Sequence, residues 1–262
     1  MFETYSLTLL LTLGGGLLVT GAIAGVLAGL LGVGGGIVIV PVLFYLFDIL
    51  NLPDAVSMHV AVATSLATII PTSISSARSH NKRGNLDFEL FRKWAPLILV
   101  GAAIGGFSAR YFNGDHLTLI FGGIALLVSI NMALPKKLVL ADDLPKSPIA
   151  NGTIGAVIGF FSSLMGIGGG TLSVPTLTLF SQPVLRAVGT ASAFGLVIAV
   201  PAVIGFIFAG LSAEGRPPFS LGYVNIPAAV LIFSATIGAR IASAINARAL
   251  KLAFAGFLFL TA

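Results

Sequence analysis

The chain has 262 residues, of which 56% are hydrophobic and only 9% are charged, and its mean hydropathy is +1.05. Because a soluble domain carries about 25% charged residues, this composition excludes a water-soluble domain and indicates a polytopic membrane protein. The net charge of +5 does not indicate nucleic-acid binding, because the basic residues lie in short connections between apolar runs, where they report membrane orientation.

Apolar runs along the chain predict an all-α protein with two sets of five membrane segments. A spanning helix needs about 17 to 25 apolar residues, and most of the runs reach that length. The first run has no basic region before it, so we expect a retained membrane helix rather than a signal peptide. The first set comprises 6–31, 36–50, 55–77, 94–112 and 116–134, and the second comprises 148–166, 170–182, 186–211, 222–243 and 247–262.

A glycine-rich motif occurs twice and interrupts an apolar stretch each time. The first copy is Gly32-Val33-Gly34-Gly35-Gly36, with Pro41 after it, and the second is Gly166-Ile167-Gly168-Gly169-Gly170, with Pro175 after it. The segment that follows each copy is short, as in a half-helix or a re-entrant piece. Paired glycine- and proline-broken segments at matching positions of two halves indicate the binding site of a transporter.

Further matches extend the repeat. The run at 61–65 is similar to the run at 187–191, and the one long polar stretch, 135–147, falls between the halves. The sequence therefore predicts an internal duplication with three parts. These are a first transmembrane repeat at 1–134, a polar cytoplasmic linker at 135–147 and a second transmembrane repeat at 148–262.

Five segments in each repeat make the repeats inverted, because an odd number of crossings flips the second copy. With the glycine-linked pair entering and leaving on one side, most loop lysines and arginines fall on one face, and only Arg110 and Arg216 fall on the other. This positive-inside signal predicts both termini outside. We expect a multi-pass protein of a bacterial or archaeal inner (plasma) membrane, in contact with membrane lipid.

The glycine clusters themselves are candidate anion sites. A helix that restarts after each cluster has free N–H donors and partial positive charge at its first turn. The candidate substrate-binding glycines are Gly34, Gly35, Gly36, Gly168, Gly169 and Gly170. The alternative is tight helix packing, which we expect for the spaced glycines Gly101-xxx-Gly105 and Gly155-xxx-Gly159.

Together, the two glycine copies, the run Ala-Val-Ala-Thr-Ser-Leu-Ala at 61–67 and the run Arg-Gly-Asn-Leu-Asp at 83–87 resemble the TauE/SafE family. This family is also called the sulfite exporter or 4-toluene sulfonate uptake group. The resemblance covers nearly the whole chain and implies transport of sulfite, organosulfonates or related sulfur-containing anions. It does not choose among these anions, or between export and import. Ala191 stands where the first half has Ser65, and Ser192 is adjacent to it, so a shared site would have unequal halves.

The remaining polar residues favour an anion over a cation as substrate. All carboxylates fall in loops or at segment ends, which disfavours a cation carrier and a carboxylate metal site. Hydroxyls of Thr64, Ser65, Thr190 and Ser192 are candidate donors to an anion, or else bond to nearby carbonyls and across helices. His59 is a candidate proton site or a structural histidine, whereas His80 and His116 are expected in loops.

These observations predict a secondary transporter of small sulfur-containing anions, which works by alternating access around a midplane site. The alternative is an anion channel with the same pore donors. We expect no enzyme and no cofactor, because the chain has no Gly-x-Ser-x-Gly elbow, no His-Glu-x-x-His pair and no Walker loop. Proton coupling and the oligomeric state are left open.

Overall fold

The structure is a computed structural model that describes residues 14–24, 35–133, 139–145 and 147–238. An apolar helix at Gly14–Ala24 comes first. The elements that follow are α2 (Gly36–Ile49), α3 (Asp54–Lys82), α4 (Phe88–Ser108), the 3-10 turn η2 (Ala109–Tyr111), α5 (Gly114–Ala133), α6 (Pro148–Met165), α7 (Gly170–Leu179), α8 (Val184–Gly210), β1 (Ser220–Leu221), β2 (Val224–Asn225) and α9 (Ile226–Gly238). The expected segments at 6–31 and 247–262 lie partly or wholly outside the described residues.

The helical prediction is confirmed in kind, with differences at the ends of elements. α3 continues to Lys82 and α4 begins at Phe88, so both extend into stretches that hydropathy assigned to a loop. The side chain of Asp87 explains the early start of α4, because its Oδ1 accepts a hydrogen bond from the N–H of Leu90 at 3.0 Å and caps the helix. His80 is therefore not a loop residue but a buried residue in the last turn of α3.

A small antiparallel hairpin makes the fold not purely helical. β1 pairs with β2 through Ser220 opposite Asn225 and Leu221 opposite Val224. Gly222 has φ of +58° in the turn between them, a conformation that glycine adopts without strain. The hairpin occupies the start of the expected segment at 222–243, and α9 begins only at Ile226.

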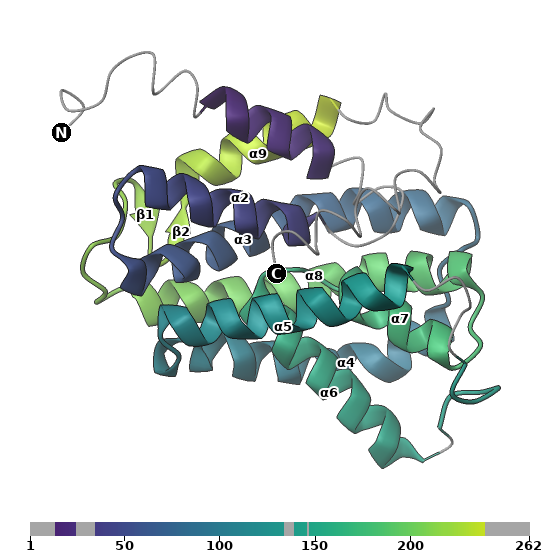
Figure 1. Cartoon of the computed structure of the whole chain (residues 1–262). Coiled ribbons are helices and arrows are strands. Elements are labelled where there is room, and N and C mark those ends of the chain that lie inside the picture. The colour runs from purple at the N-terminus through teal and green to yellow at the C-terminus, as the bar shows by residue number, and fades with distance from the viewer. Residues whose placement is uncertain (1–13, 25–34, 134–138, 146, 239–262) are drawn as a thin grey trace.

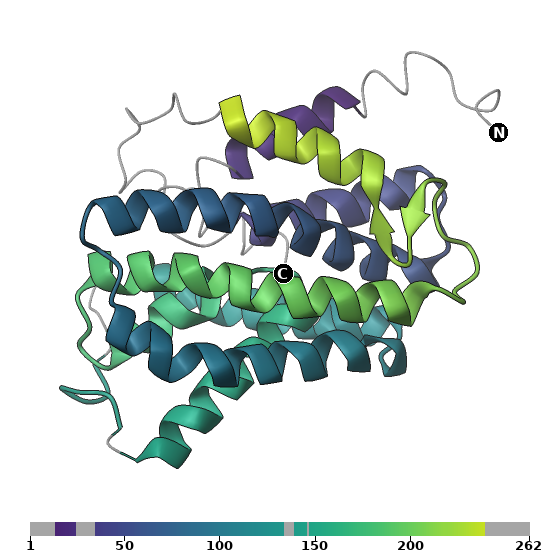
Figure 2. The same cartoon turned by 180° about the vertical axis from the view of Figure 1, so that it is seen from behind.

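Three long helices form the centre of the molecule, with α8 between α3 and α4 (Figure 2). α3 and α8 run in opposite directions. Gly189, near the start of α8, lies against Asn85, just beyond the end of α3, whereas Tyr223, beyond the end of α8, stacks on His59 in the first third of α3. α2 covers α3, and α9 lies with the helix at Gly14–Ala24 beyond them (Figure 1).

Glycines let α4 approach its neighbours closely on two sides. A Cβ added to Gly101 would lie 2.0 Å from the carbonyl oxygen of Ala156 in α6, and one added to Gly159 would lie 2.1 Å from the carbonyl oxygen of Ile98. On the α8 side, a Cβ on Gly205 would lie 2.4 Å from the carbonyl carbon of Gly106. The expected packing role is confirmed for Gly101, Gly105 and Gly159, whereas a Cβ on Gly155 would make only ordinary contact, 3.4 Å from the Cβ of Leu97.

The connections α2–α3 and α7–α8 have the same backbone geometry. Asn51 and Ser181, which lie two residues beyond the ends of the two short helices, have φ of 54° and 58°, although neither is glycine. Pro53 and Pro183 then precede the long helices with φ, ψ of −58°, 133° and −56°, 130°. In both places the chain therefore passes from a short helix to a long one through the same backbone shape.

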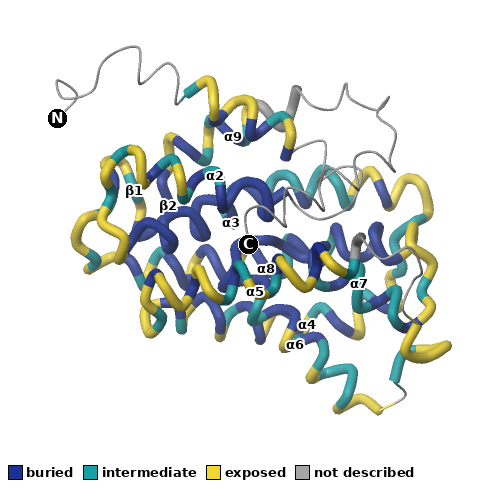
Figure 3. The backbone as a smooth tube through the Cα atoms, in the orientation of Figure 1, coloured by how far each residue is buried: buried dark blue, intermediate teal, exposed yellow. Residues whose placement is uncertain are grey.

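Five helices in the described part of the chain are long and apolar enough to cross a membrane, namely α3, α4 with η2, α5 through Asn131, α6 and α8. The outer surface carries large apolar side chains along these helices, and Leu119, Leu127 and Phe208 are 74%, 67% and 61% exposed. Small hydroxyl side chains are buried instead, and Figure 3 shows the buried residues concentrated in α2, α3 and the middle of α8.

Candidate functional site

The second glycine cluster forms a tight turn between α6 and α7. α6 ends at Met165, and Gly166 follows it with φ of +68°. Gly168 has φ of +67°, and α7 begins at Gly170. A side chain at either positive-φ position would be strained, which explains the two glycines. The N–H of Ile167 donates to the carbonyl oxygen of Ser162 at 3.3 Å and closes the turn.

The two glycine clusters contact each other. A Cβ added to Gly36, at the start of α2, would lie 2.1 Å from the carbonyl oxygen of Gly166 and 2.9 Å from the Cα of Ile167. Ser65 Oγ of α3 donates to the same carbonyl oxygen at 2.7 Å. Gly35 has φ of +74° before α2, and Gly34 lies outside the described residues. The two clusters therefore touch in the interior, beside the middle of α3, through Gly36 of the first cluster and Gly166 of the second.

Gly169 approaches α8 in the same way. A Cβ added to it would lie 2.5 Å from the carbonyl oxygen of Ala191 and 2.7 Å from the N of Gly195. The turn is thus enclosed between α3 on one side and α8 on the other. Close approach, which is the packing alternative, accounts for the absence of side chains at Gly36 and Gly169.

Thr64 and Thr190, both expected at the site, each accept a hydrogen bond from a backbone N–H in the other half of the chain. Thr64 Oγ1 of α3 accepts from the N–H of Asn225 at 3.0 Å, and Thr190 Oγ1 of α8 accepts from the N–H of Asp87 at 3.0 Å. Asn225 and Asp87 each accept from an N–H in the first turn of the next helix, α9 or α4. Each threonine therefore holds a helix start that belongs to the other half of the chain.

The two serines expected as donors already have acceptors. Ser192 Oγ donates to the carbonyl oxygen of Gly189 at 2.6 Å, within its own helix, and Ser65 Oγ donates across to Gly166. A hydroxyl has one proton to donate. An anion would therefore have to displace a carbonyl acceptor at either serine.

Three buried hydroxyls near the glycine turn are without a hydrogen-bond partner among the described residues. They belong to Ser162, in the last turn of α6, and to Thr171 and Ser173, in the first turns of α7. Leaving a buried polar group unsatisfied costs about 1–3 kcal/mol. Sequence reasoning missed these residues because they have no matched hydroxyl in the first half. The signal that was available was their position directly beside the second cluster.

His59 lies at the end of the molecule that contains η2 and the hairpin. Its Nε2 lies 2.9 Å from the carbonyl oxygen of Phe112 and 3.3 Å from that of Ala109. Because carbonyls only accept, Nε2 carries the proton. The ring stacks on Tyr223 with 4.8 Å between centroids. These contacts fit the structural alternative for this histidine and join η2 and the hairpin to α3.

The interior of the described part of the chain contains no buried Asp, Glu, Lys or Arg. Acidic residues lie in connections or end turns, and in this part of the chain no three His, Asp or Glu side chains are grouped as a metal ion would require. Buried donors near the glycine clusters are therefore neutral hydroxyls and backbone amides. Such a set can bind an anion without a basic side chain.

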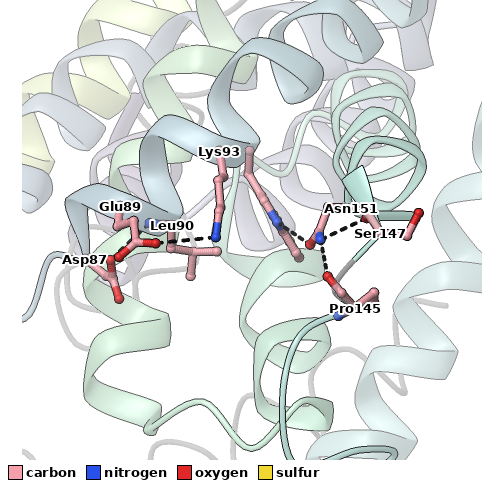
Figure 4. Close-up of polar contacts among 8 residues, drawn as sticks. Asp87, Glu89, Leu90, Lys93, Pro145, Ser147 and Asn151 are labelled. Carbon is pink, nitrogen blue, oxygen red and sulfur yellow. Dashed lines mark hydrogen bonds and ion pairs between the residues drawn. The ribbon is translucent and has the colours of Figure 1, made fainter. Parts of the chain in front are cut away.

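α4 is fixed at its polar end by side-chain hydrogen bonds (Figure 4). Trp94 Nε1 donates to Asn151 Oδ1 of α6 at 3.1 Å, and Asn151 Nδ2 donates to the carbonyl oxygens of Pro145 and Ser147. Lys93 and Glu89 form an exposed ion pair on the same end. Trp94 also stacks on Phe194 of α8 with 6.2 Å between centroids. The indole thus lies at the junction of α4, α6 and α8.

Apolar helices that expose large hydrophobic side chains and bury hydroxyls define an integral, multi-pass membrane protein. Residues 17–262 match the family described as Sulfite exporter TauE/SafE, and the chain belongs to this family of membrane transporters. The resemblance seen in the sequence is confirmed.

Relatives cover the chain almost completely. A probable membrane transporter protein of Haemophilus influenzae is 35% identical over 94% of this chain and 95% of its own length. Probable membrane transporter proteins of Methanocaldococcus jannaschii and Bacillus subtilis are 30% and 31% identical, over 92% and 88% of this chain and 91% and 87% of their own lengths. No solved structure matches the chain significantly.

Proposed function

We propose that this protein is a secondary transporter of small sulfur-containing anions such as sulfite or organosulfonates. The observation that supports it most directly is the set of neutral, buried hydroxyls without a partner beside the second glycine cluster, those of Ser162, Thr171 and Ser173. A helix N-terminus offers free N–H groups and partial positive charge to an anion. The description of the family as sulfite exporters supports the substrate class.

The matched connections at Pro53 and Pro183 and the opposite directions of α3 and α8 support an inverted repeat. Alternating access then arises when one repeat or bundle moves against the other around the glycine clusters. Two hydrogen bonds join the repeats at separate places: Thr64 bonds to the start of α9, and Thr190 bonds to the start of α4. Rearrangement of these contacts accompanies the change in access.

Charge at the two ends supports the orientation. The end with the α3–α4 connection carries exposed Arg78, Lys82, Arg83, Arg92, Lys93 and Arg186. The opposite end carries Asp48, Asp54, Asp115 and Glu214 beside Arg110 and Arg216. We propose that the basic end faces the cytoplasm, as the positive-inside rule favours, with both termini outside in a bacterial or archaeal plasma membrane.

Uptake of radiolabelled sulfite into proteoliposomes tests the transport proposal, with thiosulfate, sulfate and taurine as competitors. Saturable uptake above that of protein-free liposomes is the expected result. Flux that rises linearly with concentration, together with single-channel currents, would favour the channel instead. Absence of flux for every sulfur anion, in protein that is monodisperse and thermally stable, would refute the substrate class.

Proton coupling at His59 is tested in the same liposomes by imposing a pH gradient. His59→Gln retains a side-chain N–H for the Phe112 carbonyl and removes the titrating ring. If His59 couples transport to protons, the gradient accelerates uptake by the parent protein and has no effect on the variant. A parent rate that is the same with and without the gradient would remove proton coupling from the mechanism.

A further inference from the structure

The hydroxyls of Thr171 and Ser173 have no hydrogen-bond partner among the described residues, unlike those of the other two threonines of α7. A helical Ser or Thr usually donates to the carbonyl three or four residues earlier, as Thr176 does to Leu172 at 2.7 Å and Thr178 does to Pro175 at 2.9 Å. In the first turns this carbonyl belongs to the glycine turn, and neither Thr171 nor Ser173 bonds to it. They are 2% and 0% exposed, so water on the outer surface does not satisfy them either.

The corresponding positions of α2 are apolar. Gly36 begins α2 as Gly170 begins α7, so Ile37 stands where α7 has Thr171, and Ile39 stands where it has Ser173. Both isoleucines are buried, at 0% and 1% exposed. Packing at these positions is therefore possible with apolar side chains alone. Packing therefore does not explain why α7 has hydroxyl side chains at these positions, since a buried hydroxyl without a partner is less favourable than a methyl group.

A ligand bound at the start of α7 would explain these hydroxyls, because it would accept their hydrogen bonds. The first N–H groups of α7 have no intrahelical acceptor, and the helix dipole places partial positive charge there. Because Cα–Cβ bonds tilt toward the helix N-terminus, the side chains of Thr171 and Ser173 both lean toward that end, from different sides of the helix, since they are two residues apart. Ser162 precedes the turn and is 0% exposed, also without a partner.

We infer that the oxyanion site of this transporter is built on one half of the chain. Backbone amides at the start of α7 and the hydroxyls of Thr171, Ser173 and Ser162 bind the oxygens of a small sulfur oxyanion or sulfonate, and the cluster before α2 packs against the turn as its wall. This inference rests on the proposed function, because it takes an anion as the substrate. In this arrangement the anion is bound by donors of the second half alone, rather than by two equivalent sets of donors, one from each half.

The chain offers its own optical reporter. Trp94 is its one tryptophan, and it stacks on Phe194, whose Cβ would lie 2.8 Å from a Cβ on Gly169. A ligand at the start of α7 is therefore separated from the indole by a single side chain. Binding of sulfite to the purified full chain in detergent is followed by Trp94 emission and, independently, by the ligand-induced rise in Tm.

Thr171→Val and Ser173→Ala are the test variants, and Thr176→Val is the matched control because its hydroxyl already has an acceptor. Each test variant is expected to raise the Kd for sulfite about tenfold or more, since each removes a hydrogen bond to a charged ligand. The control is expected to keep the parent Kd. Thr171→Val also removes an unsatisfied hydroxyl, so its Tm without sulfite stays at or above that of the parent.

The outcomes separate this inference from the proposed function. A parent protein that binds and transports sulfite while both test variants keep its Kd would overturn the hydroxyl site and leave the transport proposal standing. Loss of binding in Thr176→Val to the same extent would also overturn it, because the effect would then not be specific to the free hydroxyls. A parent that neither binds nor transports any sulfur anion would refute both.

Discussion

Replacing Gly36 by alanine tests whether the contact between the two glycine clusters holds the interior together. The new Cβ would lie 2.1 Å from the carbonyl oxygen of Gly166, whereas ordinary contact begins at 3.4 Å. The turn after α6 would have to retreat by about 1.3 Å. Ser65 Oγ, 2.9 Å from the same Cβ, donates to that oxygen at 2.7 Å and would lose its hydrogen bond.

The expected cost combines two effects. Overpacking of a closed interior costs about 1–3 kcal/mol, and loss of the Ser65 hydrogen bond adds about 0.5–1.5 kcal/mol. At about 2–4 °C per kcal/mol for a chain of this size, Gly36→Ala lowers Tm by about 3–18 °C. Thermal unfolding of the purified protein in detergent, followed by Trp94 emission, measures the change.

Gly123→Ala is the matched control. Gly123 lies within α5, and an added Cβ there meets nothing within 4 Å. Because alanine favours a helix over glycine by up to about 1 kcal/mol, this variant keeps or slightly raises Tm. Equal Tm values for the parent and Gly36→Ala would refute the close contact between the clusters, and an equal loss in both variants would show that the effect is not local.

Three further changes test the polar contacts around the centre by the same Tm measurement. Thr190→Val leaves the backbone N–H at the start of α4 without its acceptor and costs about 1–3 kcal/mol, whereas Thr190→Ser keeps the parent Tm; equal values for the two variants would contradict the contact. Asn151→Leu removes the acceptor of the Trp94 N–H, which lowers Tm and shifts the indole emission; unchanged emission would refute that bond. Lys93→Ala removes an ion pair whose side chains are 64% and 85% exposed, so Tm stays within about 2 °C of the parent value, and a larger fall would indicate a buried role.

Hydropathy alone located most of the described helices, because burial in a bilayer demands length and apolar composition wherever the chain crosses. The expected segments at 36–50 and 148–166 differ from α2 and α6 by a single residue at their C-terminal ends. The same criterion failed at the start of α4, where capping by Asp87 rather than hydropathy decides the boundary. It also failed at the hairpin, because two-residue strands leave no periodic pattern.

Hydrogen-bond partners could not be predicted in the same way. Thr64 and Thr190 were recognised as a matched pair, but their contacts with Asn225 and Asp87 join residues more than 100 positions apart. Such contacts depend on how the helices pack, and the sequence gives only the residue types. Ser65 and Ser192 look alike in sequence as hydroxyl donors, yet one bonds across to Gly166 and the other stays within its own helix.

The comparison between the halves separates features that support the scaffold from features that distinguish the site. Pro53 and Pro183 have matching backbone angles, and Thr64 and Thr190 both accept from a backbone N–H at the start of another helix, so these features support the scaffold in both halves. Hydroxyls at the start of α7 have no such equivalent, because α2 has isoleucines there. A scaffold that packs well with isoleucine gains nothing in stability from an unsatisfied hydroxyl. If Thr171 and Ser173 bind the substrate, as we propose, then the difference between the halves, rather than their likeness, identifies the site.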